Sequence, residues 1–221
     1  MRRIQKGAQP ACLITLQCSP TMTSWDDVPG DVKGELREAL VREQGGLCAY
    51  CMGRIVPSHS GMKIEHWSAR HDDPHAVFAW SNLLGVCTGV SGDASEPHDR
   101  RFHCDTYRGN LPPSQQELCV HPAGDLRVGV FTFTRVGRIE AHQPQARQDI
   151  ERLNLNHWRL LMNRKAAYDY LHHRMSDVGY RPAEVERLLL RLRTPGRDGN
   201  LREYVGVMEQ YIERWLRRHG S

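Results

Sequence analysis

Apolar residues recur every three or four positions over the C-terminal third of the chain, a pattern typical of amphipathic helices. The pattern is most regular in 201–219, where its members are Leu201, Tyr204, Val205, Met208, Tyr211, Ile212, Trp215 and Leu216. We expect Asn200 to cap this helix, Gly220 to end it, and Arg217 and Arg218 to complement the helix dipole in its last turn. Such a stripe indicates core packing, and an exposed face that docks a partner is the alternative.

Shorter patterns precede this helix. We expect one helix over 145–153, another that starts after Asn156 and reaches Met175, and a third that opens with Pro182 and ends before Pro195. Upstream of these, the alternation predicts a short strand followed by a turn at Gly137 and a return at Ile139. The residues of that strand pattern are Leu126, Val128, Val130, Phe131 and Phe133.

The first half of the chain is less periodic. Residues 1–30 contain several prolines and little core pattern, so we expect an irregular arm that becomes ordered on a partner. Asp31 is the expected N-cap of a helix that ends at Gly45-Gly46. Residues 47–110 are rich in Cys, His, Gly and Asp, which favours a small module held by metal, with a loop over 88–100.

Length and composition fit a globular protein. The chain has 221 residues, 39% of them apolar, with a mean hydropathy of −0.59, and nothing in it matches a membrane span of about 20 apolar residues. The N-terminus lacks the apolar segment of a signal peptide, so we expect a cytoplasmic protein. The changes in pattern divide the chain into 1–46 (arm and helix), 47–110 (metal module) and 111–221 (hairpin and helices).

Charge is uneven along the chain. Residues 151–221 carry 14 basic and 9 acidic side chains, a net charge of +5, whereas the whole chain has +4. Of its 30 basic residues 26 are arginines, whose planar guanidinium suits phosphate. This indicates nucleic acid as a partner, although the codon usage of a GC-rich genome would give the same composition.

Four of the seven cysteines cluster between positions 48 and 104. Cys48 and Cys51 are spaced to share one metal ion, and Cys87 and Cys104 can complete a tetrahedral zinc site. His103 is an alternative to Cys104 as the fourth ligand. A redox-active pair is the other interpretation of Cys48-Ala49-Tyr50-Cys51, but no parallel-strand pattern surrounds it. The other three cysteines have no ligand spacing: Cys12, Cys18 and Cys119.

An acid and a histidine, Glu65-His66, lie between the cysteine pairs, followed by Asn82 and, after Cys104, by Asp105. This order resembles the zinc-containing branch of the HNH nucleases, whose ββα-metal core sits between two zinc-binding halves. The resemblance implies an α+β fold: a zinc-stapled ββα-metal core in 47–110, with a small β-hairpin and a mostly α-helical C-terminal half.

The resemblance also implies a role for each residue. His66 would be the general base and Asn82 would brace the loop that orients it. Glu65 would help to hold a catalytic divalent ion, usually Mg²⁺, with either Asp105 or His103 as the last ligand. Because neighbours on a regular strand face opposite sides, Glu65 and His66 can serve one ion only where the strand bends or ends. Three arginines near the last ligand could contact substrate phosphates: Arg100, Arg101 and Arg108.

Further motifs are similar to those of one HNH group, the nuclease subunits of Septu-type anti-phage defence, which also occur beside some retrons. They are the opening Met-Arg-Arg-Ile-Gln-Lys-Gly, Leu47-Cys48-Ala49-Tyr50-Cys51, Leu84-Gly85-Val86-Cys87, His103-Cys104-Asp105 and Leu153-Asn154-Leu155-Asn156. The resemblance implies a metal-dependent endonuclease that acts on DNA or RNA as a defence effector, with an ABC-type ATPase as partner.

Two other functions remain open. A non-catalytic zinc module that binds nucleic acid or protein would keep the four cysteines but would not need Glu65, His66 and Asp105 to converge. A regulatory subunit with a vestigial nuclease site is the third hypothesis. Whether those three side chains face a common cavity away from the zinc distinguishes the first two.

Overall fold

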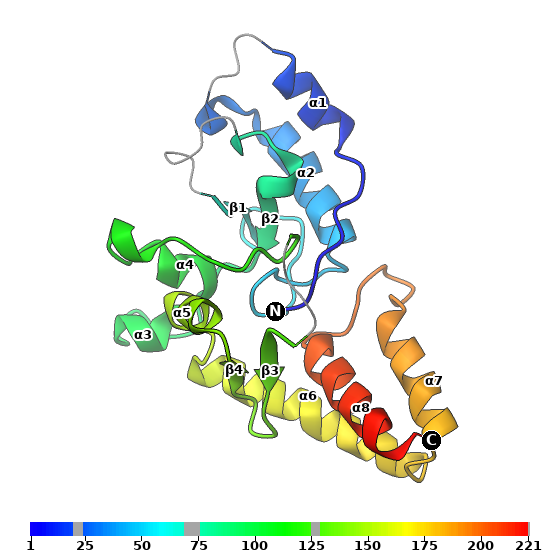
Figure 1. Ribbon diagram of the computed structural model, residues 1–221. Helices are drawn as coiled ribbons and strands as arrows, with labels where there is room; N and C mark the ends of the chain where they lie inside the picture. The colour runs from blue at the N-terminus through cyan, green and yellow to red at the C-terminus, as the bar shows by residue number, and fades with distance from the viewer. Residues whose placement is uncertain (20–23, 69–75, 125–128, 221) are drawn as a thin grey trace.

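The structure, a computed structural model, describes residues 1–19, 24–68, 76–124 and 129–220 of the chain. Within these ranges it combines helices with two small antiparallel sheets, so the predicted α+β class is confirmed (Figure 1). Buried residues from the N-terminal arm, the cysteine-rich module and the helical half form one apolar cluster. None of the helices in these ranges has the length and apolar character needed to cross a membrane.

The N-terminal segment packs on the rest of the chain, contrary to the expected irregular arm. It contains helix α1 (Ala11–Gln17) and a one-turn 3₁₀ helix (Trp25–Asp27). Its apolar side chains are spaced too irregularly to show a pattern in the sequence, but they are buried in the core: Met1, Ile4, Leu13, Leu16, Trp25 and Val28. Partner-dependent ordering is therefore not needed to explain this segment.

Helix α2 (Gly30–Glu43) starts after Pro29, one residue before the predicted N-cap. Asp31 lies inside the first turn, where its carboxylate accepts the N–H of Val32. The predicted C-terminal end is confirmed, because Gly45 and Gly46 both have positive φ and turn the chain out of the helix. α1 packs on α2, which covers the first sheet.

The first sheet pairs β1 (Lys63–His66) with β2 (Leu83–Val86), so that Glu65 lies opposite Leu84. A 3₁₀ turn (Trp80–Asn82) leads directly into β2. Two short helices follow, α3 (His98–Arg101) and α4 (Cys104–Arg108). The predicted loop over 88–100 is largely correct, although α3 begins within it and Val90 forms a bridge with Phe102.

The second sheet is a hairpin of β3 (Phe131–Phe133) and β4 (Ile139–Ala141), followed by α5 (Pro144–Arg152). The turn predicted at Gly137 is confirmed, with φ of +82°. The strand is shorter than predicted at its start, since Val130 precedes it. The predicted strand positions Leu126 and Val128 lie outside the described residues. A 3₁₀ turn (Pro113–Gln115) lies earlier, between α4 and this sheet.

Three long helices form the C-terminal half: α6 (Trp158–Asp177), α7 (Pro182–Arg193) and α8 (Val205–His219). α8 packs against both of the others through Val205, Met208, Ile212 and Trp215, as its spacing predicts. The N-cap predicted at Asn200 is wrong, because α8 begins only after Tyr204. Tyr204 has a φ of +56° and donates its N–H to the carbonyl of Met52 (3.0 Å), a long-range contact that determines where the helix starts.

Candidate metal centre and adjoining carboxylate cluster

The turn between Cys48 and Cys51 is shaped by backbone hydrogen bonds. Cys48 donates its N–H to Gly53 O (2.8 Å), and Met52 donates its N–H to Cys48 O (3.0 Å). Gly53 N–H points at Cys51 Sγ (3.3 Å). Amide donors directed at a sulfur stabilise the thiolate form that binds metal. Both cysteines are buried.

Cys87, just beyond β2, and Cys104, the first residue of α4, bring the other two sulfurs to this turn. The ligand atoms of all four cysteines lie within 4.8 Å of one another. A tetrahedron with Zn–S bonds of about 2.3 Å has edges of about 3.8 Å. The Sγ atoms of Cys51 and Cys87 are 3.8 Å apart. Among the described residues this is the one group of three or more Cys, His, Asp or Glu side chains placed to hold a metal ion, and its geometry fits zinc.

The closeness of the four sulfurs favours a cation at this site. Burial raises the pKa of the Cys104 thiol, and contacts with the other cysteine sulfurs raise it further. Four neighbouring sulfurs, three of them in buried residues, cannot all be deprotonated without a compensating positive charge, which a zinc ion would supply. Cys104 also has a φ of +54°, which is unfavourable for a residue with a Cβ, so its ligand position requires a strained backbone.

His103 lies against this sulfur cluster. Its Nδ1 is 3.2 Å from Cys104 Sγ, and its Nε2 is 2.8 Å from the hydroxyl of Ser91. Burial lowers the pKa of His103 to about 4, so the ring is neutral at physiological pH. The structure thus brings Cys104 into the ligand set and places His103 in the shell around the ligands, where such groups fix ligand orientation.

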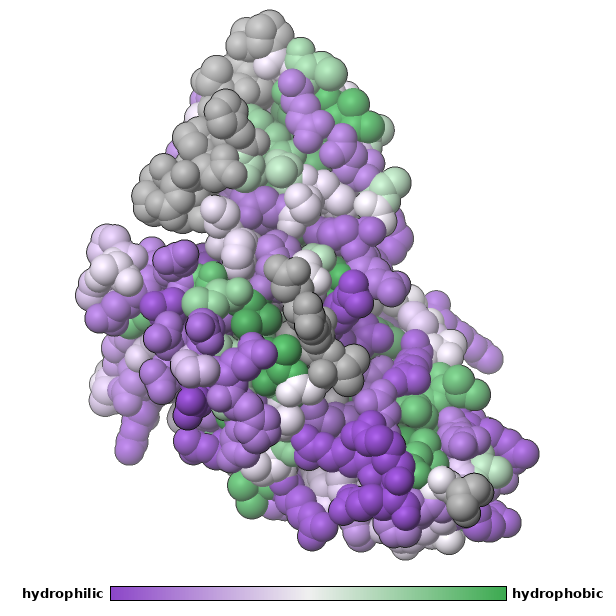
Figure 2. All heavy atoms as spheres, viewed as in Figure 1, coloured by the Kyte–Doolittle hydropathy of each residue, from purple (hydrophilic) through white to green (hydrophobic). Residues whose placement is uncertain are grey.

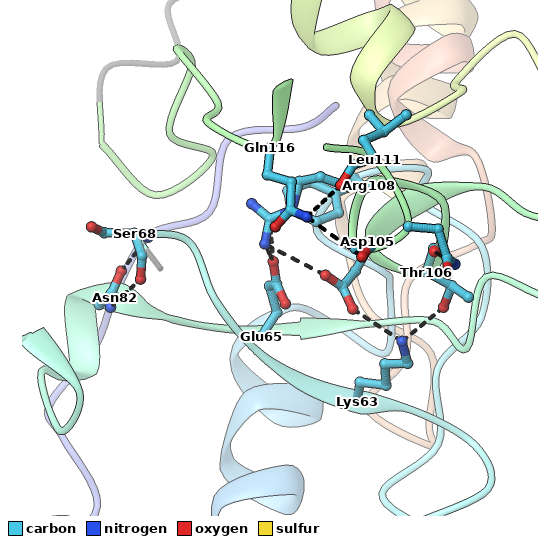
Figure 3. A network of polar contacts seen from close by, with 12 residues as sticks. Lys63, Glu65, Ser68, Asn82, Asp105, Thr106, Arg108, Leu111 and Gln116 are labelled. Atoms are coloured by element: carbon cyan, nitrogen blue, oxygen red, sulfur yellow. Dashed lines mark hydrogen bonds and ion pairs between the residues drawn. The ribbon is translucent and has the colours of Figure 1, made fainter. Parts of the chain in front are cut away.

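The carboxylates of Glu65 and Asp105 meet in a second cluster, reached from β1 and α4 (Figure 3). Arg108 lies between them and donates to Glu65 and to Asp105 Oδ1 (3.4 Å). Lys63 donates to Asp105 Oδ2 (3.0 Å), and the hydroxyl of Tyr50 donates to Glu65 Oε1 (3.3 Å). Tyr50 belongs to the cysteine turn, so this residue connects the carboxylate cluster to the cysteine cluster.

Burial and neighbouring charges shift the pKa values of the two carboxyl groups in opposite directions. Burial raises the pKa of Glu65 well above its usual range, and the nearby charge of Asp105 adds to this rise. Burial also acts on Asp105, but hydrogen bonding with Glu65 and the charge of Lys63 outweigh it and lower the pKa of Asp105. Two neighbouring carboxyl groups with oppositely shifted pKa values are typical of acid–base and metal sites, and also of buried ion-pair networks.

As arranged, these two carboxylates are a poor fit for a divalent cation. They are the hard oxygen donors that Mg²⁺ prefers, but Arg108 already pairs with both of them, and Lys63 pairs with Asp105. Arg108 is itself buried, with 8% of its surface exposed, so it is not one of a set of exposed phosphate contacts as expected from sequence. The arrangement leaves room for a metal between the carboxylates only where Arg108 has moved away.

His66, at the end of β1, has different surroundings from Glu65. Its Nε2 is 3.0 Å from the carbonyl of Val77, and its ring packs edge-on against Trp25 with centroids 4.6 Å apart. Because a carbonyl only accepts, this contact places the proton on Nε2 and the lone pair of the neutral ring on Nδ1. The contacts described for Glu65 and His66 therefore do not bring both side chains to one point.

Asn82 holds the start and end of the segment that follows β1. Its Oδ1 accepts the N–H of Ser68 (2.8 Å), and its Nδ2 donates to the carbonyls of Ser68 (3.2 Å) and Ala76 (3.1 Å; Figure 3 shows the Ser68 contacts). The amide thus holds Ser68 and Ala76, while its expected role in orienting His66 stays a prediction. His66, the last residue of β1, lies two positions before Ser68, and Val77, which its Nε2 contacts, follows Ala76.

The other two arginines expected to contact nucleic acid lie on α3. Arg100 is exposed, and its carbonyl accepts from His157 (2.7 Å). Arg101 is half-buried, with its guanidinium 4.7 Å from the centre of the Phe102 ring. Arg100 can reach a ligand in solution, whereas Arg101 is partly occupied by this ring contact.

Two members of the carboxylate cluster, Lys63 and Tyr50, were not predicted from the sequence, and Arg108 was given a different role. Lys63 lies two positions before Glu65, and such residues share one face of a strand. Arg108 follows Asp105 by three positions, which puts both on one face of a helix. Tyr50 lies inside the cysteine turn and was hidden by the metal motif.

Comparison with known proteins adds no relative to this picture. No protein-family model matches the chain, and no curated protein matches it.

Proposed function

We propose that the chain is a metal-dependent endonuclease of the HNH kind, which hydrolyses phosphodiester bonds of nucleic acid. The observation that carries the proposal is the meeting of Glu65 and Asp105 beside the four-cysteine cluster. Glu65 comes from β1, which pairs with β2, and Asp105 comes from α4; Cys87, just beyond β2, and Cys104, in α4, belong to the cysteine cluster. Thiolates favour zinc and carboxylates favour Mg²⁺, so the donor types separate into a structural site and a reactive one.

His66 is the proposed general base. Its contact with Val77 O favours the neutral tautomer that has its lone pair on Nδ1, and a histidine titrates close to neutral pH. Asn82 is the proposed positioning residue, because it donates to the carbonyls of Ser68 and Ala76, and Ala76 is the neighbour of Val77, which His66 contacts. Loss of Asn82 would then reduce activity through the placement of His66.

Arg108 has two positions in this proposal. With its guanidinium on Glu65 and Asp105, the cluster is charge-balanced and closed. For both carboxylates to serve a divalent ion, Arg108 has to leave them, and its guanidinium then becomes free to pair with a substrate phosphate. No step of hydrolysis is assigned to an ion, since the closed arrangement does not accommodate one.

The proposal is tested with labelled DNA and RNA in the presence of Mg²⁺, using the parent chain, His66→Ala and His59→Ala, each with and without the expected ATPase. Loss of a general base typically costs about 10²–10⁴-fold in rate, so His66→Ala should lose cleavage. His59 is exposed and serves as the matched control. Zinc content should stay at one per chain in all three. His66→Gln is added because His66 packs on Trp25. Cleavage by both His66 variants at the parent rate contradicts the assignment.

A non-catalytic zinc module is the second candidate, and two observations favour it: the Arg108 contacts, and the different surroundings of His66 and Glu65. A buried guanidinium between two carboxylates, with Lys63 on the outer side, is also a complete structural ion-pair network. Such a protein would bind one zinc and fold normally, but would cleave neither DNA nor RNA under any condition in the assay above.

The proposed setting is cytoplasmic anti-phage defence with an ABC-type ATPase as partner. Since the N-terminal arm is packed into the core, its docking role is better tested by point substitutions than by deletion. α1 exposes Ile14, with 47% of its surface accessible, and the β3–β4 turn exposes Val136, with 65%. If the arm is the dock, Ile14→Glu should lose co-purification with the ATPase while Val136→Glu keeps it. Equal recovery of both variants would exclude this face of α1.

A further inference from the structure

A cavity of about 530 Å³ lies between the β3–β4 hairpin and helices α6 and α8, away from both clusters described above. Glu140 is the one acidic residue in its lining. Four arginines also line it: Arg135, Arg214, Arg217 and Arg218. Figure 2 shows a strongly hydrophilic surface over α8 on this side of the molecule. The local charge is therefore strongly positive.

None of these four arginines pairs with a carboxylate among the described residues, unlike several others in the same half. Arg174 pairs with Asp177, Arg187 with Glu184 and Arg193 with Glu213. Arg214 is instead held by neutral acceptors, with its guanidinium donating to Gln210 Oε1 (2.8 Å) and Phe133 O (3.4 Å). Its charge is thus fixed in place but not neutralised.

Two aromatic rings stand beside these charges. Tyr168 on α6 and Tyr211 on α8 both line the cavity and meet edge to face, with centroids 4.9 Å apart and planes at 85°. Guanidinium groups that follow a phosphate backbone, combined with aromatic rings on which bases stack, are the features by which proteins bind single-stranded nucleic acid.

The larger cavity of the helical half is less suited to a polyanion. It measures about 780 Å³ and is also lined by arginines. However, Asp198 and Glu203 contribute to its lining, and its Arg174 is paired with Asp177. Two acidic residues and one ion pair compensate positive charge there, whereas the hairpin cavity has Glu140 alone and none of its arginines is ion-paired among the described residues.

We infer that the cavity between the hairpin, α6 and α8 binds the phosphodiester backbone of single-stranded nucleic acid. The inference deepens the proposed function, because it gives the substrate a second contact site, and it rests on that function for the choice of nucleic acid over other polyanions. It also accounts for the excess positive charge of residues 151–221, for which the nuclease core has no need.

Binding of fluorescent single-stranded DNA, single-stranded RNA and duplex DNA to the full chain, without added Mg²⁺, tests the inference. The test variant is Arg135→Ala/Arg217→Ala, because both side chains are exposed and make no hydrogen bond within the described structure. The matched control is Arg187→Ala/Arg197→Ala, which removes the same charge from exposed positions outside the cavity.

The expected effect follows from counterion release. Each phosphate contact with a single strand releases about 0.7 counterion, so two lost contacts make the negative slope of log K against log salt shallower by about 1.4 and weaken binding about 25-fold at 0.1 M salt. The control should lose much less. Single strands should bind more tightly than the duplex, because their bases are free to stack on the tyrosines.

Three results would overturn the inference: equal losses in test and control variants, tighter binding of the duplex, or binding of polyglutamate with none of the oligonucleotides. The last would identify an acidic protein segment as the occupant. The outcome is independent of catalysis. If the test variant alone loses binding and the parent chain never cleaves, the inference stands and the proposed function fails. If the parent chain cleaves and the test variant binds as tightly as the parent, the proposed function stands and the inference fails.

Discussion

Cys104→Ser should release zinc from the chain and destabilise the whole fold. Cys104 is the cysteine that joins α4 to the turn at Cys48, and it is fully buried, as Cys48 and Cys51 nearly are. Its left-handed backbone conformation is unfavourable without the metal bond. Serine keeps the size of the side chain, so the substitution removes a ligand and adds little packing change.

The magnitude follows from the role of the metal. Zinc binding to small structural sites is worth about 10–16 kcal/mol at pH 7, which is comparable to the total stability of about 5–15 kcal/mol of a typical domain. Loss of a structural metal belongs to the changes that cost about 4 kcal/mol or more. In a chain of 150–250 residues each kcal/mol shifts Tm by about 2–4 °C, so Tm should fall by about 8–16 °C.

Elemental analysis and thermal melting of the same preparations provide the assay. The parent chain, purified without chelator, should contain about one zinc per chain, as a single four-sulfur site requires. Cys119→Ser and Cys18→Ser are the controls, because both thiols are exposed and lie outside the cluster. An unchanged Tm and zinc content in Cys104→Ser, or a parent chain that is well folded without metal, would refute the reasoning.

Three further changes test particular contacts. Arg108→Met should lower the free energy of unfolding by about 3–5 kcal/mol in urea titrations, because it leaves buried Glu65 without its cation; a change below about 1 kcal/mol would show that the pair is not buried in solution. Burial lowers the pKa of His157, whose Nδ1 accepts a backbone N–H of α6. The stability that neutral His157 gives the fold is complete above pH 6.5 and is lost as the pH falls from 6.5 towards the lowered pKa. Between about pH 7.5 and 5.5, Tm should therefore drop more in the parent than in His157→Asn, and equal drops would contradict this. Gly137→Ala should destabilise the chain by more than Gly179→Ala. Both glycines have positive φ, but only at Gly137 would a Cβ lie 2.2 Å from a backbone oxygen of α6. Equal unfolding midpoints of the two variants would refute the predicted clash.

The sequence predicted best those features that depend on local spacing. α6, α7 and the Gly137 turn follow from periodicity, proline position and the conformational freedom of glycine. The four cysteines follow from ligand chemistry, since few other residue types at this spacing can hold zinc. These signals act within a few residues or through one ion.

Features set by distant contacts were predicted less well. α8 starts at Val205 because Tyr204 binds the backbone of Met52, a contact 152 positions away that the capping preference of Asn200 cannot reveal. The arm folds as α1 because Leu13 and Leu16 find a buried surface on the rest of the chain. Likewise the pairing of Arg108 with Glu65 depends on how α4 lies relative to β1, which its place beside the last expected ligand could not reveal, and an exposed phosphate contact was expected instead.

The rate of cleavage as a function of Mg²⁺ concentration, measured for the zinc-loaded parent chain and for Glu65→Gln, tests the central claim most directly. The substitution keeps the size of the side chain and a hydrogen-bond acceptor for Arg108, but removes the charge that a hard cation needs. The account predicts cleavage of DNA or RNA that rises and saturates with Mg²⁺ in the parent, and its loss in Glu65→Gln at an unchanged zinc content. A folded, zinc-loaded parent that cleaves neither polymer at any Mg²⁺ concentration, or a Glu65→Gln chain that cleaves like the parent, would contradict it.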